Sequence, residues 1–287
     1  MNDKARTFWV RTASAAVYAG LFIGSIYSGT LLHHTNIGVA ILTGFLFLVS
    51  LGCTYEFYRM VKKQGGRPNE VYGVLSMSCM MLTLCMMSLQ GYAFIRVASL
   101  GILLAMVPVL LIGSIVLQLW GKSKRPFADA SYTMVPMFYI GLPMGLMPMM
   151  HTSYNVLMML ILIVWANDCM AYIGGTLIGK HKLWQRHSPG KTWEGCLVGL
   201  AFSIAIAMWL GPMFNSKIAW HGWLTIGLIG SVVGTLGDLV ESMLKRSVGV
   251  KDSGNIMPGH GGFLDRFDSL LTLTPVVFAY IFIILNI

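Results

Sequence analysis

Charged residues are scarce in this sequence. Only 11% of its 287 residues are Asp, Glu, Lys or Arg, whereas globular chains carry about 25%. The chain also has no polar interval long enough to fold as a domain of its own. Instead, 56% of the residues are hydrophobic, and apolar runs of about 20 residues, the length that crosses a bilayer, recur along the chain. We therefore expect a single membrane domain over residues 1–287, with an all-α polytopic fold.

Cysteine patterns typical of metal or redox sites are missing as well. The five cysteines form no Cys-x-x-Cys pair and lie in or beside apolar segments, so we expect them to be small buried hydrophobes. The 21 methionines have no accompanying His or Cys pattern for a soft metal, which favours a packing role. The first apolar run lacks a clear small-residue cleavage site and is interpreted as a retained span.

The apolar runs predict nine membrane-spanning helices. Their approximate bounds are residues 13–32, 36–55, 71–89, 97–119, 132–150, 156–178, 195–214, 222–240 and 269–287. If successive connections alternate between the two sides, every Lys and Arg except Arg96 and Lys217 falls on one side. Lys and Arg are retained in the cytoplasm, so the N-terminus is predicted to be cytoplasmic and the C-terminus outside. This asymmetry explains the net charge of +9 without a nucleic-acid partner, and anionic lipid headgroups would contact the same loops.

The first half of the chain has no acidic residue inside a predicted span. Glu56 lies at an inner end and Asp129 in a loop. The spacings Gly20-x-x-x-Gly24 and Gly141-x-x-x-Gly145 allow close helix approach. We therefore assign residues 1–150 to helix packing, with a homodimer as an open alternative, and residues 151–287 to the catalytic helices and inner loops.

Carboxylates enter the apolar segments only in the second half. Asp168 lies within the sixth span, where a charge costs a few kcal/mol, so it should face a polar cavity or a partner; an ion pair with a neighbouring helix is the alternative. Around the inner end of the eighth span, Asp238, Glu241, Ser242 and Lys245 are spaced i, i+3, i+4, i+7. If this segment is helical, these four side chains share one face.

One inner loop reads Ser188-Pro189-Gly190-Lys191-Thr192-Trp193-Glu194-Gly195. The Ser-Pro pair is expected to start a turn, and Thr192 and Glu194 could satisfy amides at the start of the next helix. A phosphate-binding P-loop is not complete here, because position 185 is Gln and no strand precedes the loop.

A second inner loop contains Pro258-Gly259-His260-Gly261-Gly262. This sequence predicts a tight loop with accessible amides. Asp265 and Asp268 follow at i and i+3 near the start of the ninth span, where a helix N-terminus favours negative groups. A plain N-terminal cap is the alternative interpretation of that turn.

Together these inner segments predict phosphoryl or nucleotidyl transfer at the inner membrane surface. Carboxylates without Cys or paired His suit a hard cation such as Mg²⁺, and Lys and Arg can neutralise a transferring phosphoryl group. A cation or proton transporter is the competing class, since Asp168 and Asp238 could form a path. Against it, the phosphate-type groups lie on one side only, and the first half has no matching acidic site.

The motifs of residues 165–270 carry a resemblance to a known family. They comprise Ser242-Met243-Leu244-Lys245-Arg246, Lys251-Asp252, Pro258-Gly259-His260-Gly261-Gly262 and Leu264-Asp265-Arg266-Phe267-Asp268, preceded by Gly237-Asp238, the loop of residues 188–195 and Asn167-Asp168. This long spaced pattern resembles the phosphatidate cytidylyltransferases, also called CDP-diacylglycerol synthases. Gly190 departs from the family pattern, in which a second lysine is expected before Lys191. The Asp-x-x-Asp-Gly-x-x-Ala-Arg type pattern of the CDP-alcohol phosphotransferases, a related alternative, is absent.

The resemblance implies transfer of CMP from CTP to phosphatidate, giving CDP-diacylglycerol and pyrophosphate, with Mg²⁺ required and a second cation left open. It also implies a bacterial-type inner membrane enzyme whose active site faces the cytoplasm. The implied catalytic residues are Asp238, Lys245, Arg246, Asp265 and Arg266. The implied substrate-binding residues are Lys180, Ser188, Lys191, Thr192, Glu194, Ser242, Lys251, His260, Gly261 and Gly262. The implied metal ligands are Asp238 and Asp265, with Asp168 and Asp268 as further candidates.

Overall fold

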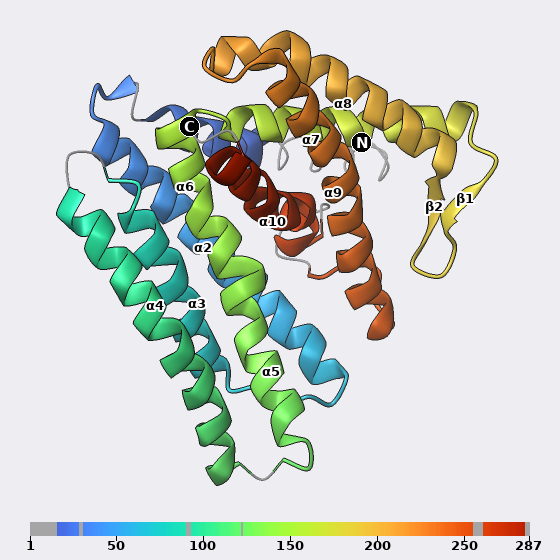
Figure 1. Ribbon diagram of the computed structural model, residues 1–287. Coiled ribbons are helices and arrows are strands. Elements are labelled where there is room, and N and C mark those ends of the chain that lie inside the picture. Colours follow the sequence, from blue (N-terminus) through green and yellow to red (C-terminus); the bar gives the residue numbers. More distant parts are fainter. Residues whose placement is uncertain (1–15, 29–30, 90–92, 122, 255–260, 285–287) are drawn as a thin grey trace, which may run out of the picture. The chain divides into compact units, whose positions relative to one another are not determined.

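The computed structural model describes residues 16–28, 31–89, 93–121, 123–254 and 261–284. Most of these residues are helical (Figure 1). In chain order the elements are the helix Ala16–Ser28, α2 (Thr35–Lys63), α3 (Glu70–Met86), α4 (Ala93–Val116), η1 (Leu117–Trp120), α5 (Pro126–Pro136), η2 (Met137–Gly141), α6 (Leu142–Tyr154), α7 (Leu157–Leu177), β1 (Lys182–Trp184), β2 (Ser188–Thr192), α8 (Trp193–Phe214), α9 (Trp220–Ser247), α10 (Leu264–Ala279) and η3 (Tyr280–Ile284).

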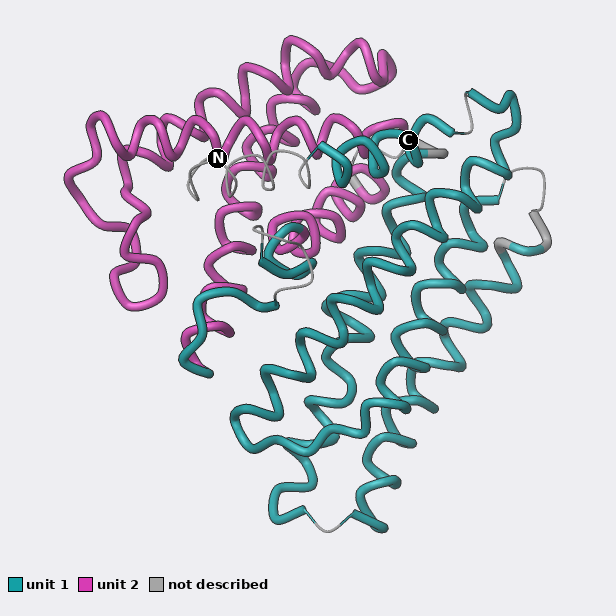
Figure 2. Tube along the Cα trace, turned by 180° about the vertical axis from the view of Figure 1, so that it is seen from behind, with its two compact units in different colours: residues 1–152, 248–266 teal, residues 153–247, 267–287 magenta. Residues whose placement is uncertain are grey.

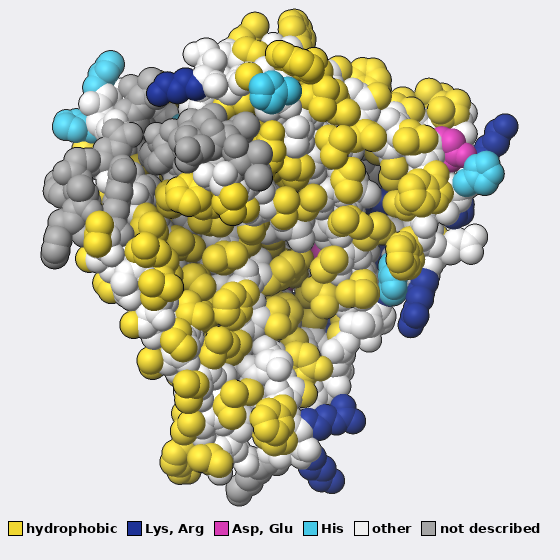
Figure 3. Space-filling model, in the orientation of Figure 1, with side chains coloured by type: hydrophobic (Ala, Val, Ile, Leu, Met, Phe, Trp, Pro, Cys, Tyr) yellow, Lys and Arg dark blue, Asp and Glu magenta, His cyan; other side chains and the backbone are white. Residues whose placement is uncertain are grey.

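Within the described residues, seven helical segments are long and apolar enough to cross a membrane. They are Thr35–Lys63, Val97–Trp120, Pro126–His151, Leu157–Leu177, Trp193–Phe214, Trp220–Ser247 and Leu264–Ile283. Two shorter apolar helices, Ala16–Ser28 and Glu70–Met86, coincide with the first and third predicted spans. On the face shown in Figure 3, hydrophobic side chains predominate and Lys and Arg are few. The chain is thus a helical integral membrane protein, as predicted, whereas the count of nine spans and the orientation of the termini stay predictions.

The described part of the chain departs from an all-helical fold at one short antiparallel hairpin. Strand β1 pairs with β2, with Lys182 opposite Thr192 and Trp184 opposite Ser188. The predicted turn at Ser188-Pro189 is therefore wrong, because Ser188 begins the second strand and the turn precedes it. Proline has no backbone N–H to donate to the neighbouring strand. Pro189 is tolerated because both strands of a two-stranded sheet are edge strands, in which not every N–H is paired.

The helices form two units, which are coloured separately in Figure 2. Unit 1 consists of residues 1–152 and 248–266, and unit 2 of residues 153–247 and 267–287. The segment 248–266, which carries much of the family signature, belongs to the unit formed by the N-terminal helices. The functional division at residue 150 stays a prediction.

Methionine fills much of the interior of unit 1, as expected. Fully buried side chains from α3 and from the segment η2 to α6 include Met77, Met81, Met137 and Met144. The spacing Gly141-x-x-x-Gly145 supports this packing, because a Cβ on Gly141 would lie 2.7 Å from the backbone oxygen of Met77. At Gly20-x-x-x-Gly24 the described chain makes no such contact, since a Cβ at either glycine meets no described atom within 4 Å, so close approach there stays a prediction.

The cysteines follow the prediction only in part. Cys53 and Cys85 are buried, but Cys79 and Cys169 are exposed on α3 and α7. These two positions face outward from apolar helices, where lipid can accommodate a small hydrophobic side chain as well as a protein interior does.

In unit 2, helices α7, α8 and α9 pack closely through small residues. A Cβ on Gly195 would lie 2.5 Å from the backbone oxygen of Ala171, and one on Gly227 would lie 3.0 Å from that of Ser203. Glycine at these positions lets the helix backbones approach, which is typical of membrane helices. The polar residues in the middle of α7 and α9 are thereby brought together.

Candidate functional site

Helix α9 carries the predicted polar stripe. It is helical throughout Trp220–Ser247, so Asp238, Glu241, Ser242 and Lys245 share one face. The Ser242 hydroxyl donates to Asp238 Oδ1 at 3.2 Å, and the Lys245 ammonium forms an ion pair with the buried Glu241 carboxylate. The periodicity of the sequence therefore predicted this face correctly.

Within unit 2, three carboxylates converge beside this stripe. One oxygen from each of Asp238, Glu241 and Asp268 lies within 4.8 Å of the other two. Asp268 is contributed by α10, where the Ser269 amide donates to its Oδ1 at 2.7 Å. Helix α10 can approach because Gly237 has no side chain; a Cβ there would lie 2.8 Å from the Asp268 backbone oxygen. We refer to Asp238, Glu241 and Asp268 as the acid cluster.

The acid cluster fits a divalent cation. Its ligand atoms are all carboxylate oxygens, which hard cations such as Mg²⁺ prefer over nitrogen or sulfur. Three carboxylates at this separation repel one another, and a bound cation would offset that repulsion. Glu241 was not predicted as a ligand, although its place three residues after Asp238 on one helical face is the signal that could have identified it.

Lys191 reaches the acid cluster from the hairpin. Its ammonium lies 2.5 Å from Asp238 Oδ2. The next residue, Thr192, caps helix α8, since its Oγ1 accepts a hydrogen bond from the Gly195 amide at 3.2 Å. The predicted capping role of Thr192 is confirmed, and it holds Lys191 at the end of β2, beside the carboxylates of α9.

Glu194, at the start of α8, binds the segment that follows α7. Its carboxylate accepts hydrogen bonds from the amides of Lys180 at 3.1 Å and His181 at 3.2 Å, and His181 Nδ1 lies 2.5 Å from its Oε1. These amides follow α7, and the carboxylate also bonds its own amide in the first turn of α8, as predicted. An open cavity of about 800 Å³ adjoins this junction; it is lined by Lys180, His181, Lys182, Gln185 and Trp193.

Asn167 is the buried centre of a polar network between the helices of unit 2. Its Oδ1 accepts a hydrogen bond from Ser231 at 2.6 Å, and its amide donates to Thr235 at 3.2 Å. The neighbouring Asp168 side chain is exposed and close enough to Asp268 to repel its charge. Asp168 thus contributes to the electrostatic surroundings of the acid cluster.

In unit 1, Glu56 organises the signature segment. This carboxylate is 1% exposed and accepts hydrogen bonds from the Phe263 amide at 3.1 Å, the Leu264 amide at 3.0 Å and the Ser253 hydroxyl at 2.9 Å. Since Leu264 is the first residue of α10, a side chain of α2 satisfies amides at the N-terminus of α10, where negative charge is favoured.

Asp265 completes this arrangement from the first turn of α10. Its Oδ2 accepts hydrogen bonds from the Ser253 amide at 3.0 Å and the Gly262 amide at 2.8 Å. The Ser253 hydroxyl lies 2.9 Å from both Asp265 Oδ2 and Glu56 Oε2, so the two carboxylates share its one proton. Gly261 has a φ of +83°, a left-handed conformation that favours glycine. We refer to Glu56, Ser253 and Asp265 as the loop anchor. Sequence reasoning noted Glu56 only as an acid at the inner end of a span, because nothing local indicates partners about 200 residues away.

The remaining predicted residues are more accessible than the members of these two clusters. Arg246, Lys251, Arg266 and Lys180 are exposed, and Ser188, the first residue of β2, is half-buried. His260 lies outside the described residues. The structure thus brings together Lys191, Asp238, Ser242, Lys245 and Asp268 in unit 2, and Gly262 and Asp265 in unit 1.

Comparison with known proteins identifies the family of the chain. A model of the cytidylyltransferase family matches residues 9–284. The chain belongs to this family. The phosphatidate cytidylyltransferase of Staphylococcus epidermidis is 34% identical over 272 residues, which cover 93% of this chain and 96% of the relative. The resemblance indicated by the motifs is thereby confirmed.

Two further relatives match over a shorter region. The phosphatidate cytidylyltransferases of Staphylococcus saprophyticus and Staphylococcus aureus are each 43% identical, over 159 and 163 residues respectively. The matched region covers 54% of this chain and 60% of each relative. The matched region thus covers less than two thirds of the full length of either relative.

A glycine-to-alanine change tests the helix contact that forms the acid cluster. We expect Gly237→Ala to lower the free energy of unfolding by about 1–3 kcal/mol, because the added methyl group must push α10 away from α9. Thermal unfolding of the purified protein in detergent measures the effect. Gly44→Ala is the matched control, since a Cβ at Gly44 in α2 meets nothing within 4 Å; equal unfolding temperatures for the two variants would contradict the close contact.

Proposed function

We propose that the protein is a phosphatidate cytidylyltransferase that transfers CMP from CTP to phosphatidate with the help of Mg²⁺. The observation that supports this proposal most directly is that Asp238, Glu241 and Asp268 converge next to Lys191. They do so in an integral membrane protein of the cytidylyltransferase family. The names of the relatives support the choice of CTP and phosphatidate as substrates. The basic inner loops support an active site that faces the cytoplasm.

The reaction needs little acid–base chemistry from the protein. A phosphatidate oxygen, already anionic, attacks the α-phosphorus of CTP, and the bond from that phosphorus to the bridging oxygen breaks, so that pyrophosphate leaves. The protein must bring two anions together and stabilise the charge on the leaving group. Bound at the acid cluster, Mg²⁺ would neutralise phosphate oxygens of the nucleotide.

The residues of unit 2 then have distinct tasks. Asp238, Glu241 and Asp268 hold the cation, and the Ser242 hydroxyl orients Asp238 through its hydrogen bond to Oδ1. Lys191 supplies a positive charge beside Asp238 and contacts a phosphate of CTP. Lys245 offsets the charge of Glu241. Thr192 and Glu194 position the hairpin, and Lys180, with Lys182, offers positive charge at the open cavity next to it.

In unit 1, the loop anchor shapes the signature segment. Asp265 Oδ2 accepts hydrogen bonds from the amides of Ser253 and Gly262. We therefore assign Asp265 chiefly to fixing the turn of Gly261 and Gly262, and its role as a metal ligand stays a prediction. Lys251 and Arg266 are exposed and would contact phosphate groups. A homodimer stays a prediction.

The direct test is synthesis of the lipid product. Purified protein is incubated in mixed micelles with radiolabelled CTP, phosphatidate and Mg²⁺, and the organic phase is analysed for labelled CDP-diacylglycerol. We expect labelled lipid and an equal amount of pyrophosphate, both abolished by EDTA. No product under conditions in which the Staphylococcus epidermidis relative is active would refute the proposal.

Replacement of Lys191 tests its phosphate contact. We expect Lys191→Gln to reduce kcat/KM for CTP about 100-fold, since a charge-assisted contact to a phosphate contributes roughly 2–3 kcal/mol. Lys191→Arg should recover a large part of the loss because it keeps the charge. Lys217→Gln, an exposed position outside the site, is the control. If all three variants had the same kcat/KM, Lys191 would have no role in CTP turnover.

A further inference from the structure

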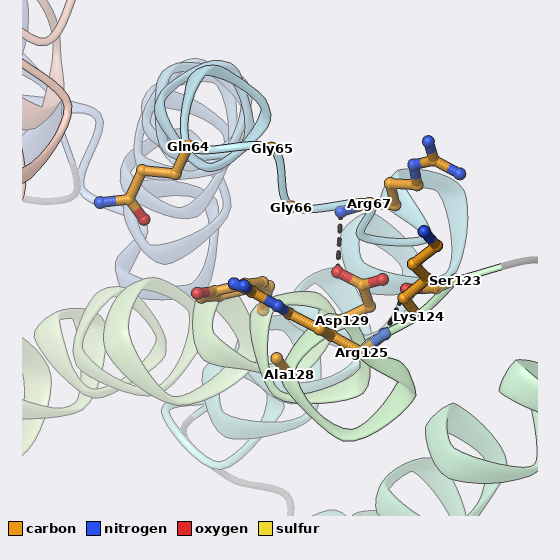
Figure 4. Close-up of a pocket in the computed structure, with 10 residues that line it drawn as sticks. Gln64, Gly65, Gly66, Arg67, Ser123, Lys124, Arg125, Ala128 and Asp129 are labelled. Atoms are coloured by element: carbon orange, nitrogen blue, oxygen red, sulfur yellow. Dashed lines mark hydrogen bonds between the residues drawn. The ribbon is translucent and has the colours of Figure 1, made fainter.

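A second polar cavity lies in unit 1 and shares no residue with the acid cluster or the loop anchor. Its volume is about 350 Å³, within the usual size of small-ligand sites. It is lined by Gln64, Gly65, Gly66, Arg67, Ser123, Lys124, Arg125, Ala128, Asp129 and Tyr132. Figure 4 shows Arg67 on the connection after α2, opposite the segment that carries Lys124 and Arg125 into α5. We call it the basic cavity.

Hydrogen bonds hold the two walls of the basic cavity together. The Arg67 amide donates to Asp129 Oδ1 at 2.8 Å, as the dashed line in Figure 4 marks. Two residues further on, the Asn69 amide donates to the Thr133 hydroxyl at 2.9 Å, and that hydroxyl donates to the Asp129 backbone oxygen at 2.7 Å. The connection after α2 is thus fixed to α5, so the cavity exists before any ligand arrives.

The charge of the basic cavity favours an anion. Among the described residues that line it, three are cationic, Arg67, Lys124 and Arg125, and one is a carboxylate, Asp129, which is 2% exposed and accepts the Arg67 amide. Helix α5 starts here at Pro126, and its N-cap residue Arg125 makes no side-chain cap hydrogen bond to the described residues. The amides at this helix end add partial positive charge, which suits a phosphate group.

Exposed aromatic side chains stand on either side of residues 123–125 in the sequence. Trp120 of η1 and Phe127 of α5 are 77% and 75% exposed. Aromatic residues at the ends of membrane helices lie at the level of the lipid headgroups. The positive-inside rule accounts for cations in this loop, but it requires neither a preformed cavity nor neighbouring aromatic side chains. Their combination suits a ligand with an anionic head and an apolar tail.

We propose that the basic cavity binds the phosphate of an anionic phospholipid headgroup. Lys124 and Arg125 hold the phosphate oxygens, and the exposed side chains of Trp120 and Phe127 lie against the acyl chains. This site is additional to the proposed catalytic function and does not depend on it, because it can be assayed without CTP or Mg²⁺.

Binding is tested with the full-length protein in neutral detergent. Micelles with increasing phosphatidylglycerol are added, and hydrogen–deuterium exchange is followed in peptides covering residues 123–135. We expect phosphatidylglycerol, but not phosphatidylcholine, to slow exchange there. The double variant Lys124→Gln/Arg125→Gln should weaken the apparent affinity roughly tenfold or more, whereas Lys124→Arg/Arg125→Lys should keep it.

A charge-matched control separates this site from general attraction to anionic micelles. Lys63→Gln/Lys217→Gln removes the same charge at exposed positions that do not line the cavity, and we expect it to bind like the wild type. If Lys124→Gln/Arg125→Gln bound phosphatidylglycerol as tightly as the wild type, the proposed site would be wrong. Protection by millimolar inorganic phosphate, with none by phosphatidylglycerol, would overturn the lipid assignment and identify a soluble anion as the ligand.

Discussion

Asp238→Asn is expected to lower kcat/KM for CTP by about 10³-fold. The change replaces a carboxylate of the acid cluster with a neutral amide, which weakens cation binding and the stabilisation of the leaving pyrophosphate. It also removes the partner of Lys191. Steady-state kinetics over a range of Mg²⁺ concentrations measures the loss, and the variant should need more Mg²⁺ for half-maximal rate.

Stability measurements distinguish this effect from misfolding. In EDTA the variant should unfold close to the wild-type temperature, because relief of the repulsion among the three carboxylates offsets the loss of the ion pair with Lys191. Added Mg²⁺ should raise the unfolding temperature of the wild type more than that of the variant. Glu70→Gln, which breaks an exposed ion pair with Lys62, is a control expected to change little. Full Mg²⁺-dependent turnover by Asp238→Asn would disprove the metal assignment.

Glu56→Gln is expected to lower the free energy of unfolding by about 2–4 kcal/mol and to reduce kcat strongly. The buried carboxylate accepts hydrogen bonds from two backbone amides and from Ser253. The NH₂ group of glutamine cannot accept a hydrogen bond, so at least one of these donors loses its buried acceptor. Because the same segment carries Asp265 and the glycine turn, we expect kcat to fall even well below the unfolding temperature.

Asp129→Asn is the matched control for Glu56→Gln. Asp129 is also a buried carboxylate of unit 1 that accepts a backbone amide, that of Arg67, but it lies outside the loop anchor. Its substitution should destabilise the protein without lowering kcat at low temperature.

Ser253→Ala, which removes the hydroxyl shared by Glu56 and Asp265, should show a smaller loss of both stability and kcat. If Glu56→Gln lost stability but kept the wild-type kcat, Glu56 would not position the signature segment.

Local patterns predicted much of the candidate site. The stripe of Asp238, Ser242 and Lys245 follows from helical periodicity alone, and the Thr192 cap follows from the preference of helix N-termini for hydroxyl side chains. The same reasoning failed at Ser188-Pro189, where pairing with β1 decides the conformation. It also missed Glu56, whose partners lie on a segment distant in the sequence.

The amino-acid sequence by itself determined that the chain is a helical membrane protein and which family it resembles, because apolar run lengths and spaced motifs are properties of short segments. Only the tertiary structure decided which acids lie together. Asp268 joins Asp238 and Glu241 because Gly237 lets α9 and α10 approach closely. Glu56 reaches the start of α10 through the packing of unit 1. Such pairings depend on how helices pack, and no local pattern encodes them.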